Sequence, residues 1–186
     1  MPAADDIPMC DVRRRDAGDL DACVSVLAEV HKVDSYPVNW PALPADWLAP
    51  PEQLAAWVAE LDGRIVGHLA LSPPVAGDVA PALWAEHSGA APAEVAVVTR
   101  LFVAPDARGH GIGSLLMSQA LREARSRGLH PVLDVVAADT GSVAFYEHLG
   151  WTLLDTAEQR WSQEQTVTVH CYAAPVRRAD RAGRST

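Results

Sequence analysis

The sequence predicts an α/β fold: a mixed, mostly antiparallel sheet of about six or seven strands flanked by helices. An apolar run at residues 95–103 precedes a glycine-rich turn, a helical segment and a second apolar strand at residues 132–137, which is the order of a parallel crossover. Asp62-Gly63, between two strand-like segments, indicates a hairpin. Residues 166–173 alternate apolar and polar side chains, as expected for the last strand of an antiparallel pair.

The first half of the chain predicts a strand, a helix and the hairpin. The strand covers residues 10–14, and the helix runs from an Asp16 N-cap to about Lys32 with apolar residues at helical spacing. Residues 34–51 carry five prolines, which exclude a long helix or a central strand there. The hairpin strands are expected at residues 54–61 and 64–71.

The second half predicts two more helices and a final strand pair. Residues 75–93, rich in Ala, Pro and Gly, read as an insertion, either a surface loop or an element beside the substrate. A helix is expected at residues 114–127, with Gly128 as its C-terminal cap. A shorter helix follows at residues 140–149, and strands are expected at residues 151–156 and 166–173.

Length and composition indicate one domain. A chain of 186 residues can bury about 70% of its unfolded surface in a single core. We expect a flexible leader at residues 1–8, the folded domain at residues 9–175 and a flexible basic tail at residues 176–186.

Charge and cysteine content limit the function classes. The net charge of −9 argues against nucleic acid as a partner and mildly favours an amine-bearing one. No segment approaches the roughly 20 apolar residues of a membrane span, so no membrane partner is expected. Three cysteines without metal-ligand spacing favour reduced thiols, a cytoplasmic protein and no metal.

The strongest local signal follows the strand at residues 95–103. Pro105 and Asp106 end that strand, and a glycine-rich turn leads into the helix. Glycines let a ligand approach the backbone, and the first-turn N–H groups of a helix have no intrahelical partners. We therefore expect phosphate or pyrophosphate at a loop formed by Arg108, Gly109, His110, Gly111, Ile112, Gly113 and Ser114.

Three other interpretations apply to this loop: a P-loop, a dinucleotide-binding turn and a plain glycine turn. A P-loop needs a Lys after the last glycine, and no Lys follows Gly113. The dinucleotide fingerprint finds only its first half in Gly109-His110-Gly111, although Asp134 follows at a plausible distance and keeps this alternative open. A glycine turn that merely joins a strand to a helix also stays open.

The loop closely resembles the pyrophosphate loop, Arg/Gln-x-x-Gly-x-Gly/Ala, of the GCN5-related N-acetyltransferase (GNAT) superfamily. Residues 139–151, Asp-Thr-Gly-Ser-Val-Ala-Phe-Tyr-Glu-His-Leu-Gly-Trp, resemble its second signature. The resemblance is strong over residues 95–151 and looser over residues 11–71. It implies acetyl-CoA as the acyl donor and two parallel central strands splayed around it, with the pantetheine arm beside Leu101, Phe102 and Val103.

The resemblance also implies catalytic roles for two residues. Tyr146 matches the tyrosine that protonates the departing thiolate, and helical spacing predicts that it faces a cleft while Phe145 is buried. In ribosomal-protein alanine acetyltransferases of this superfamily, a Glu on the following strand acts as base. The matching residue here is Asp134. A structural Asp134, a chain of waters and four further residues stay open as alternatives for the base: His31, Asp34, Glu86 and His87.

Asp139 stands where the family has Asn, a residue that commonly contacts the cofactor arm. Aspartate lacks the amide donor, so Asp139 is either a cofactor contact or only the N-cap of the next helix.

Together these features predict an acetyl-CoA-dependent N-acetyltransferase that acts directly on a small-molecule amine, a metabolite or an antibiotic. Tyr36, Trp40 and Trp84 are the candidates for the acceptor-binding wall. A protein N-terminal or side-chain acetyltransferase, a non-catalytic acyl-CoA sensor and, third, a nicotinamide oxidoreductase are the alternatives. An exposed last strand would permit a homodimer.

Overall fold

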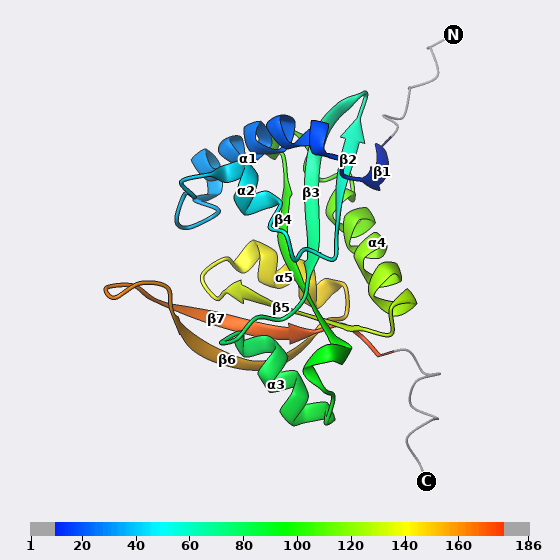
Figure 1. Cartoon of the computed structure of the whole chain (residues 1–186). Helices are drawn as coiled ribbons and strands as arrows, with labels where there is room; N and C mark the ends of the chain where they lie inside the picture. The colour runs from blue at the N-terminus through cyan, green and yellow to red at the C-terminus, as the bar shows by residue number, and fades with distance from the viewer. Residues whose placement is uncertain (1–9, 177–186) are drawn as a thin grey trace. The chain divides into compact units, whose positions relative to one another are not determined.

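The computed structural model describes residues 10–176, which form seven strands in the order β1-β2-β3-β4-β5-β7-β6 with helices against them (Figure 1). β4 (Val95–Val103) and β5 (His130–Val136) run parallel. Their ladder pairs only Val95–Val97 with His130–Val132. The other registered strand pairs are antiparallel, so the predicted mixed α/β sheet is confirmed.

The chain divides into two compact units. The first comprises residues 10–72 and 98–123 of the described chain, and the second comprises residues 73–97 and 124–176. The predicted leader lies outside the described residues, and so does the predicted tail beyond Val176. The expected single domain stays a prediction.

The hairpin of the first unit lies where the sequence predicts it. β1 (Cys10–Arg14) pairs with β2 (Ala55–Leu61), which pairs with β3 (Arg64–Ser72). Asp62 and Gly63 join β2 to β3 with φ of 51° and 77°. A two-residue turn with both φ values positive matches the twist of the strands it connects.

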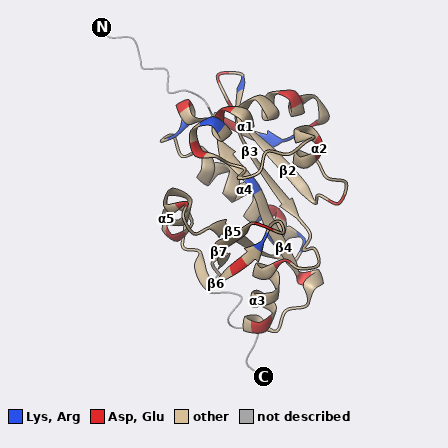
Figure 2. Ribbon diagram, turned by 90° about the vertical axis from the view of Figure 1, so that its left-hand side faces the viewer, with Lys and Arg blue, Asp and Glu red and all other residues tan. Residues whose placement is uncertain are grey.

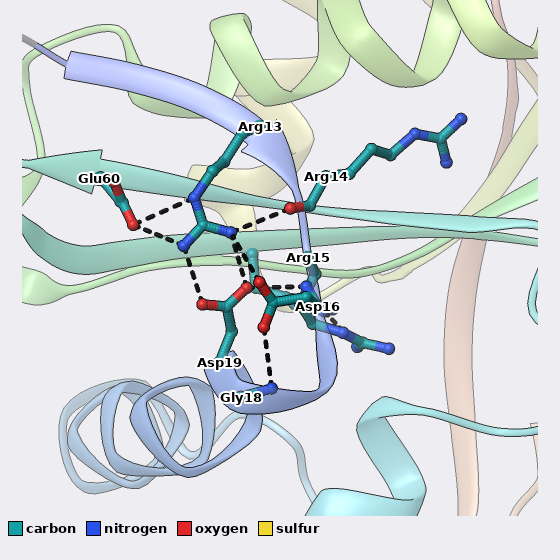
Figure 3. A network of polar contacts seen from close by, with 8 residues as sticks. Arg13, Arg14, Arg15, Asp16, Gly18, Asp19 and Glu60 are labelled. Carbon is teal, nitrogen blue, oxygen red and sulfur yellow. Dashed lines mark hydrogen bonds and ion pairs between the residues drawn. The ribbon is translucent and has the colours of Figure 1, made fainter.

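The first helix starts later than predicted. Asp16 accepts a hydrogen bond from the Gly18 N–H, but it caps a short 3₁₀ turn (Ala17–Asp19) before α1 (Leu20–Asp34). Arg13 holds this turn: its guanidinium donates to both oxygens of Asp19 at 2.8 Å and to Glu60 at 2.6 Å (Figure 3). The α1 helix is thereby tied to β1 and β2 at its start.

The second helix against this hairpin is α4 (Ile112–Ser126), and Figure 1 shows α1 and α4 on either side of β2 and β3. Gly67 of β3 lets α4 approach closely. A Cβ added at Gly67 would lie 3.1 Å from Leu116 Cδ1 and 3.2 Å from Ile112 Cγ2. Because Ile112 and Leu116 are buried here, the start of α4 is fixed by packing as well as by the glycine turn.

The second unit is built on β5, β7 (Thr166–Ala173) and β6 (Thr152–Arg160). The predicted alternation along β7 is confirmed. Every second residue of β7 points into a core shared with α3 (Val79–Ser88): Val167, Val169, Cys171 and Ala173. The α3 helix lies in the stretch that sequence patterns left as a loop or an undefined element, because Pro81 and many alanines hide its helical period.

The other face of β7 carries α5 (Thr140–His148). The Tyr172 hydroxyl donates to Glu147 Oε1 at 3.0 Å, and the ring of Tyr146 lies 6.3 Å from that of Tyr172. Since successive strand residues point to opposite faces, Tyr172 faces α5 while Cys171 faces α3. Within residues 10–176, no helix is long and apolar enough to cross a membrane.

Candidate functional site

The glycine loop joins β4 to α4 in the first unit. Gly109 and Gly111 have φ of 83° and 72°, a region that side chains with a Cβ rarely adopt. A Cβ added at either glycine would meet no atom within 4 Å, so the space beside the loop is open. The loop leads into Ile112, the first residue of α4, whose first-turn N–H groups carry the positive end of the helix dipole. This geometry fits an anionic phosphate ligand.

Arg108 is already paired in the structure. Its guanidinium forms an exposed ion pair with Asp34 at the end of α1, and its Nε donates to the carbonyl of Val103 at 3.3 Å. Arg108 is therefore held beside the loop by an acidic residue, and a phosphate would compete with Asp34 for it. Asp34, an alternative base in the sequence, is engaged in this pair.

The end of β4 is held against β3. The Ala104 N–H donates to the carbonyl of Val66 at 2.7 Å, and Phe102 is buried. Leu101 and Val103 are half-buried, as strand residues with one covered side would be. The residues predicted to lie beside the pantetheine arm thus belong to a strand end that is hydrogen-bonded to β3.

A polar centre that the sequence reasoning missed lies beside this strand. His68 of β3 is fully buried. Arg15 NH1 lies 2.9 Å from His68 Nε2, and His68 Nδ1 lies 2.8 Å from the carbonyl oxygen of Arg100. Since arginine only donates, Nε2 accepts and the Nδ1–H donates to the carbonyl. Burial, followed by the nearby arginines, lowers the pKa of His68 to about 3, so the ring is neutral.

Arg100 has an unusual backbone for a strand residue. Its φ of 55° lies in the left-handed region, where a residue with a Cβ is strained by about 1–2 kcal/mol. This backbone conformation directs the Arg100 carbonyl toward His68. The Arg100 guanidinium stacks over the Trp47 ring, 4.7 Å from the ring centroid. A charged residue within the apolar run 95–103 was the sequence signal that could have pointed to this site.

Two of the candidate acceptor residues lie on the proline-rich segment, and one of them, Tyr36, contacts the tryptophan that stacks on Arg100. Tyr36 packs edge-on against Trp47 of α2 (Pro44–Leu48), with ring centroids 6.4 Å apart. Trp40 is 40% exposed and lies 5.1 Å from the ring of His31. The proline-rich stretch thus contains the short helix α2 and is held by contacts between aromatic rings.

Asp134 lies in the second unit on the face of β5 that α3 covers, because its register partner is Cys171. The residue is exposed to solvent. The pKa of Asp134 is raised above its ordinary value. The larger cause is that surrounding protein displaces water from the carboxylate, and the smaller is the negative charge of Asp78. A carboxyl group with a raised pKa is a better proton acceptor than an ordinary aspartate.

Tyr146 differs from its expected exposure. Sequence spacing predicted a buried Phe145 beside a cleft-facing Tyr146, but Phe145 is half-buried and Tyr146 is the buried residue of α5, 8% exposed. The reason is an aromatic cluster: the rings of Trp151 and Tyr172 lie 6.0 and 6.3 Å from that of Tyr146. Asp134 and Tyr146 are on opposite faces of the β5–β7 pair, so they are not one hydrogen-bonded dyad.

Two further candidates have evident structural partners. Asp139 Oδ1 accepts from the Ser142 N–H at 3.0 Å, which makes it the N-cap of α5. Trp84 of α3 stacks on His130 with ring centroids 3.9 Å apart and packs against the core of the second unit. Their assignments to cofactor and acceptor stay predictions, as do those of the other site residues.

No metal centre is evident in the described part of the chain: residues 10–176 hold no group of three His, Cys, Asp or Glu side chains that could bind an ion.

Known proteins whose sequences are similar to this chain include N-acetyltransferases. An N-acetyltransferase of unassigned role from Methanocaldococcus jannaschii, MJ1207, is 33% identical over 106 residues, which are 56% of this chain and 42% of that protein. The N-acetyltransferase YjgM of Escherichia coli is 29% identical over 104 residues, 55% of this chain and 54% of that protein. The matched stretch thus spans about half the length of these relatives.

Solved structures share the fold at low identity. The ribosomal-protein-alanine N-acetyltransferase of Brucella melitensis matches with a TM-score of 0.67 and 20% identity, over 89% of this chain and 99% of that one. Arabidopsis thaliana NAA60 in complex with acetyl-CoA matches with a TM-score of 0.66 and 14% identity, over 90% and 100%. YncA of Salmonella typhimurium, solved with its cofactor acetyl-CoA, matches with a TM-score of 0.66 and 17% identity, over 91% and 95%.

The model of the acetyltransferase (GNAT) family matches residues 23–151, a range that includes β4, the glycine loop, β5 and α5. The matching range covers more than half of the chain and contains both sequence signatures described above. This chain belongs to the acetyltransferase (GNAT) family.

Proposed function

We propose that this protein is an acetyl-CoA-dependent N-acetyltransferase that transfers an acetyl group directly to the amine of a small molecule. The observation that carries the proposal is the loop before α4, where Gly109 and Gly111 keep positive φ and leave open space beside the backbone. Such a loop binds a pyrophosphate through N–H groups and the helix dipole.

The fit of acetyl-CoA can be assigned residue by residue. The N–H groups of the loop, from Gly109 to Ser114, would hold the pyrophosphate, and Arg108 would add charge after release from Asp34. Leu101, Phe102 and Val103 would contact the pantetheine arm. Asp139 is retained as a candidate contact through the oxygen that its N-cap hydrogen bond leaves available.

The chemistry then needs two proton transfers. The neutral amine nitrogen attacks the thioester carbonyl carbon, the C–S bond of the tetrahedral intermediate breaks, and the amine proton leaves. Asp134 accepts a proton from the amine, directly or through water, and its raised pKa suits this role. Tyr146 supplies a proton or a strengthening hydrogen bond to the departing thiolate.

The remaining assignments belong to the same proposal: a cytoplasmic protein, a metal-free reaction and a homodimer through the last strands. Tyr36, Trp40 and Trp84 are the proposed acceptor contacts. Protein acetylation is the second candidate function, since structural neighbours include a ribosomal-protein-alanine N-acetyltransferase.

The decisive experiment measures CoA-thiol release from acetyl-CoA against a panel of small amines and peptides, with mass spectrometry of the products. Acetylated small amines and affinity for acetyl-CoA by calorimetry are expected. Affinity for acetyl-CoA without release from any acceptor would instead indicate an acyl-CoA sensor. Affinity for NAD without affinity for CoA would indicate an oxidoreductase.

A further inference from the structure

The feature that the reaction above leaves unused is a pair of half-buried arginines in the first unit, Arg15 and Arg100. Arg15 is surrounded by neutral acceptors: it donates to the Leu48 carbonyl at 2.7 Å, to Gln53 Oε1 at 2.9 Å and to His68. The Arg100 guanidinium donates to Thr99 Oγ1 at 3.1 Å. Among the described residues, no carboxylate lies within ion-pair distance of either arginine.

This lack of a counter-charge is costly. Burial lowers the pKa of both arginines. For Arg100, Tyr36 opposes this shift, and the charge of Arg15 adds to it by a smaller amount. For Arg15, Cys23 and Asp19 oppose the shift without cancelling it. Neutral His68 between them adds no charge. A half-buried cation without a partner is destabilised relative to water, and a bound anion would remove that penalty.

Arg13 in the same unit is the internal contrast. Its guanidinium meets the carboxylates of Asp19 and Glu60 and holds the start of α1, as Figure 3 shows. Arg14 gives a closer match to Arg100, because both guanidinium groups lie 4.7 Å from the centroid of a tryptophan ring. The ring is Trp57 for Arg14 and Trp47 for Arg100. Arg14 is paired with Glu123, however, whereas Arg100 has no such partner in the described chain.

Arg100 is also held ready for a ligand. Its Nε–H is buried with no acceptor in the described residues, and the Trp47 ring fixes the plane of the guanidinium. The strained φ of Arg100 is maintained by the hydrogen bond from His68 to its carbonyl. Backbone strain of this kind persists only where surrounding contacts hold the residue in place. Here the held backbone keeps the Arg100 guanidinium beside the aromatic side chains of Tyr36 and Trp47.

We propose that Arg100, backed by Trp47 and Tyr36, binds a carboxylate of the acceptor, so that the substrate is a small amino acid and not a simple amine. This inference rests on the proposed acetyltransferase function and names its substrate class. A planar guanidinium pairs with a carboxylate through two parallel hydrogen bonds, which fixes the orientation of the rest of the acceptor. The overall charge of −9 does not oppose this, since water and salt screen distant charges far more than a half-buried contact.

The test compares free amino acids with their C-terminal amides as acceptors in CoA-thiol release by the full chain. The wild-type protein should prefer the carboxylate by at least about 100-fold in kcat/KM. The amine of the amide loses its proton more easily than the amine of the free amino acid. Chemical reactivity alone would therefore favour the amide, so it cannot produce a preference for the acid. Equal kcat/KM for acid and amide overturns the inference.

The variant arm uses Arg100→Gln, with Arg14→Gln as the stacked and ion-paired control. Arg100→Gln should lower kcat/KM about 100-fold for the acid and leave the amide nearly unchanged, while acetyl-CoA affinity and the thermal midpoint stay close to wild type. Arg14→Gln should leave the acid-to-amide ratio intact. An equal loss for both acceptors in Arg100→Gln overturns the inference. If that variant does not fold, the wild-type comparison still decides.

A binding arm separates this inference from the proposed function. Calorimetry with the CoA-bound protein measures the affinity for the amino acid and for its amide directly. Tighter binding of the acid supports the anion site even where no acceptor releases CoA, a result that would defeat only the acetyltransferase assignment. Peptides preferred over free amino acids with the same carboxylate overturn the small-molecule class.

Discussion

The two units of this protein hold unfavourable charges of opposite sign. In the first, Arg15 and Arg100 are half-buried without a carboxylate partner in the described residues, and burial lowers their pKa values. In the second, Asp134 has its pKa raised by loss of water and by Asp78. In each case the protein surrounds a charged group with an environment that disfavours its charge, which is typical of groups kept for ligands or protons.

Paired charges elsewhere make the difference clear. The helices α1, α3 and α5 carry red, acidic segments in Figure 2, and some of these carboxylates have partners. Asp34 pairs with Arg108, and Glu147 accepts from Tyr172. Asp19 takes both hydrogen bonds from Arg13, which lowers its pKa. These carboxylates thus have partners close by, in contrast to Arg15 and Arg100, which lack a carboxylate partner in the described residues.

The largest expected effect concerns the glycine loop. Gly111→Val should lower acetyl-CoA affinity by about 100-fold or more, because a β-branched side chain strains a φ of 72° and fills the space meant for phosphate. Gly113→Val should act in the same direction. Calorimetry measures the affinity, and Gly63→Val is the strain-matched control, since Gly63 has φ of 77° in the hairpin turn. Wild-type affinity in a folded Gly111→Val protein would reject acetyl-CoA as the ligand of this loop.

The role of Asp134 in the second unit is tested next. Asp134→Asn should reduce kcat by about 10²-fold or more and remove the acidic limb of the pH–rate profile, which lies above the ordinary aspartate range because the pKa is raised. Asp155→Asn is the control, as Asp155 also lies near Cys171. If rate and profile are both unchanged, Asp134 is structural and the base lies elsewhere.

Stability gives a second measure of the same residue. Because the folded pKa of Asp134 exceeds its unfolded value, protonation favours the folded state at low pH, and this contribution is lost as pH rises through the folded pKa. A neutral Asn should therefore not lower the thermal midpoint at neutral pH. A lower midpoint would indicate that the carboxylate has a favourable partner.

Tyr146 should show a smaller effect. If it assists the leaving thiolate, Tyr146→Phe lowers kcat by about 10- to 100-fold, with acetyl-CoA affinity and thermal midpoint nearly unchanged. Tyr172→Phe is the control: it removes a hydroxyl that donates to Glu147 and should lower stability more than kcat. Loss of stability with an intact kcat in Tyr146→Phe would assign Tyr146 to the aromatic cluster alone.

The smallest effect is expected at the ion pair beside the loop. Asp34→Asn frees Arg108 and should tighten acetyl-CoA binding by a few-fold at low salt, with the difference shrinking as salt increases. Asp106→Asn, which breaks the nearby exposed pair with Arg64, should not change the affinity. Weaker binding in Asp34→Asn would contradict the competition between Asp34 and phosphate for Arg108.

The sequence by itself determined the features that depend on short stretches of chain. The Asp62-Gly63 turn, the β4–loop–α4 order and the alternation along β7 follow from local rules: positive φ at the turn, a helix start after glycine, and opposite faces for successive strand residues. The GNAT resemblance rested on such stretches, and the family match confirms it.

Tertiary structure decided the features that need partners distant in the sequence. The α3 helix forms against β5 and β7 despite a weak pattern, and Tyr146 is buried because Trp151 and Tyr172 surround it. His68 gathers Arg15 and the Arg100 carbonyl from positions 53 and 32 residues away. No local pattern fixes such a contact, because the energy of a buried polar group depends on which distant donors and acceptors reach it.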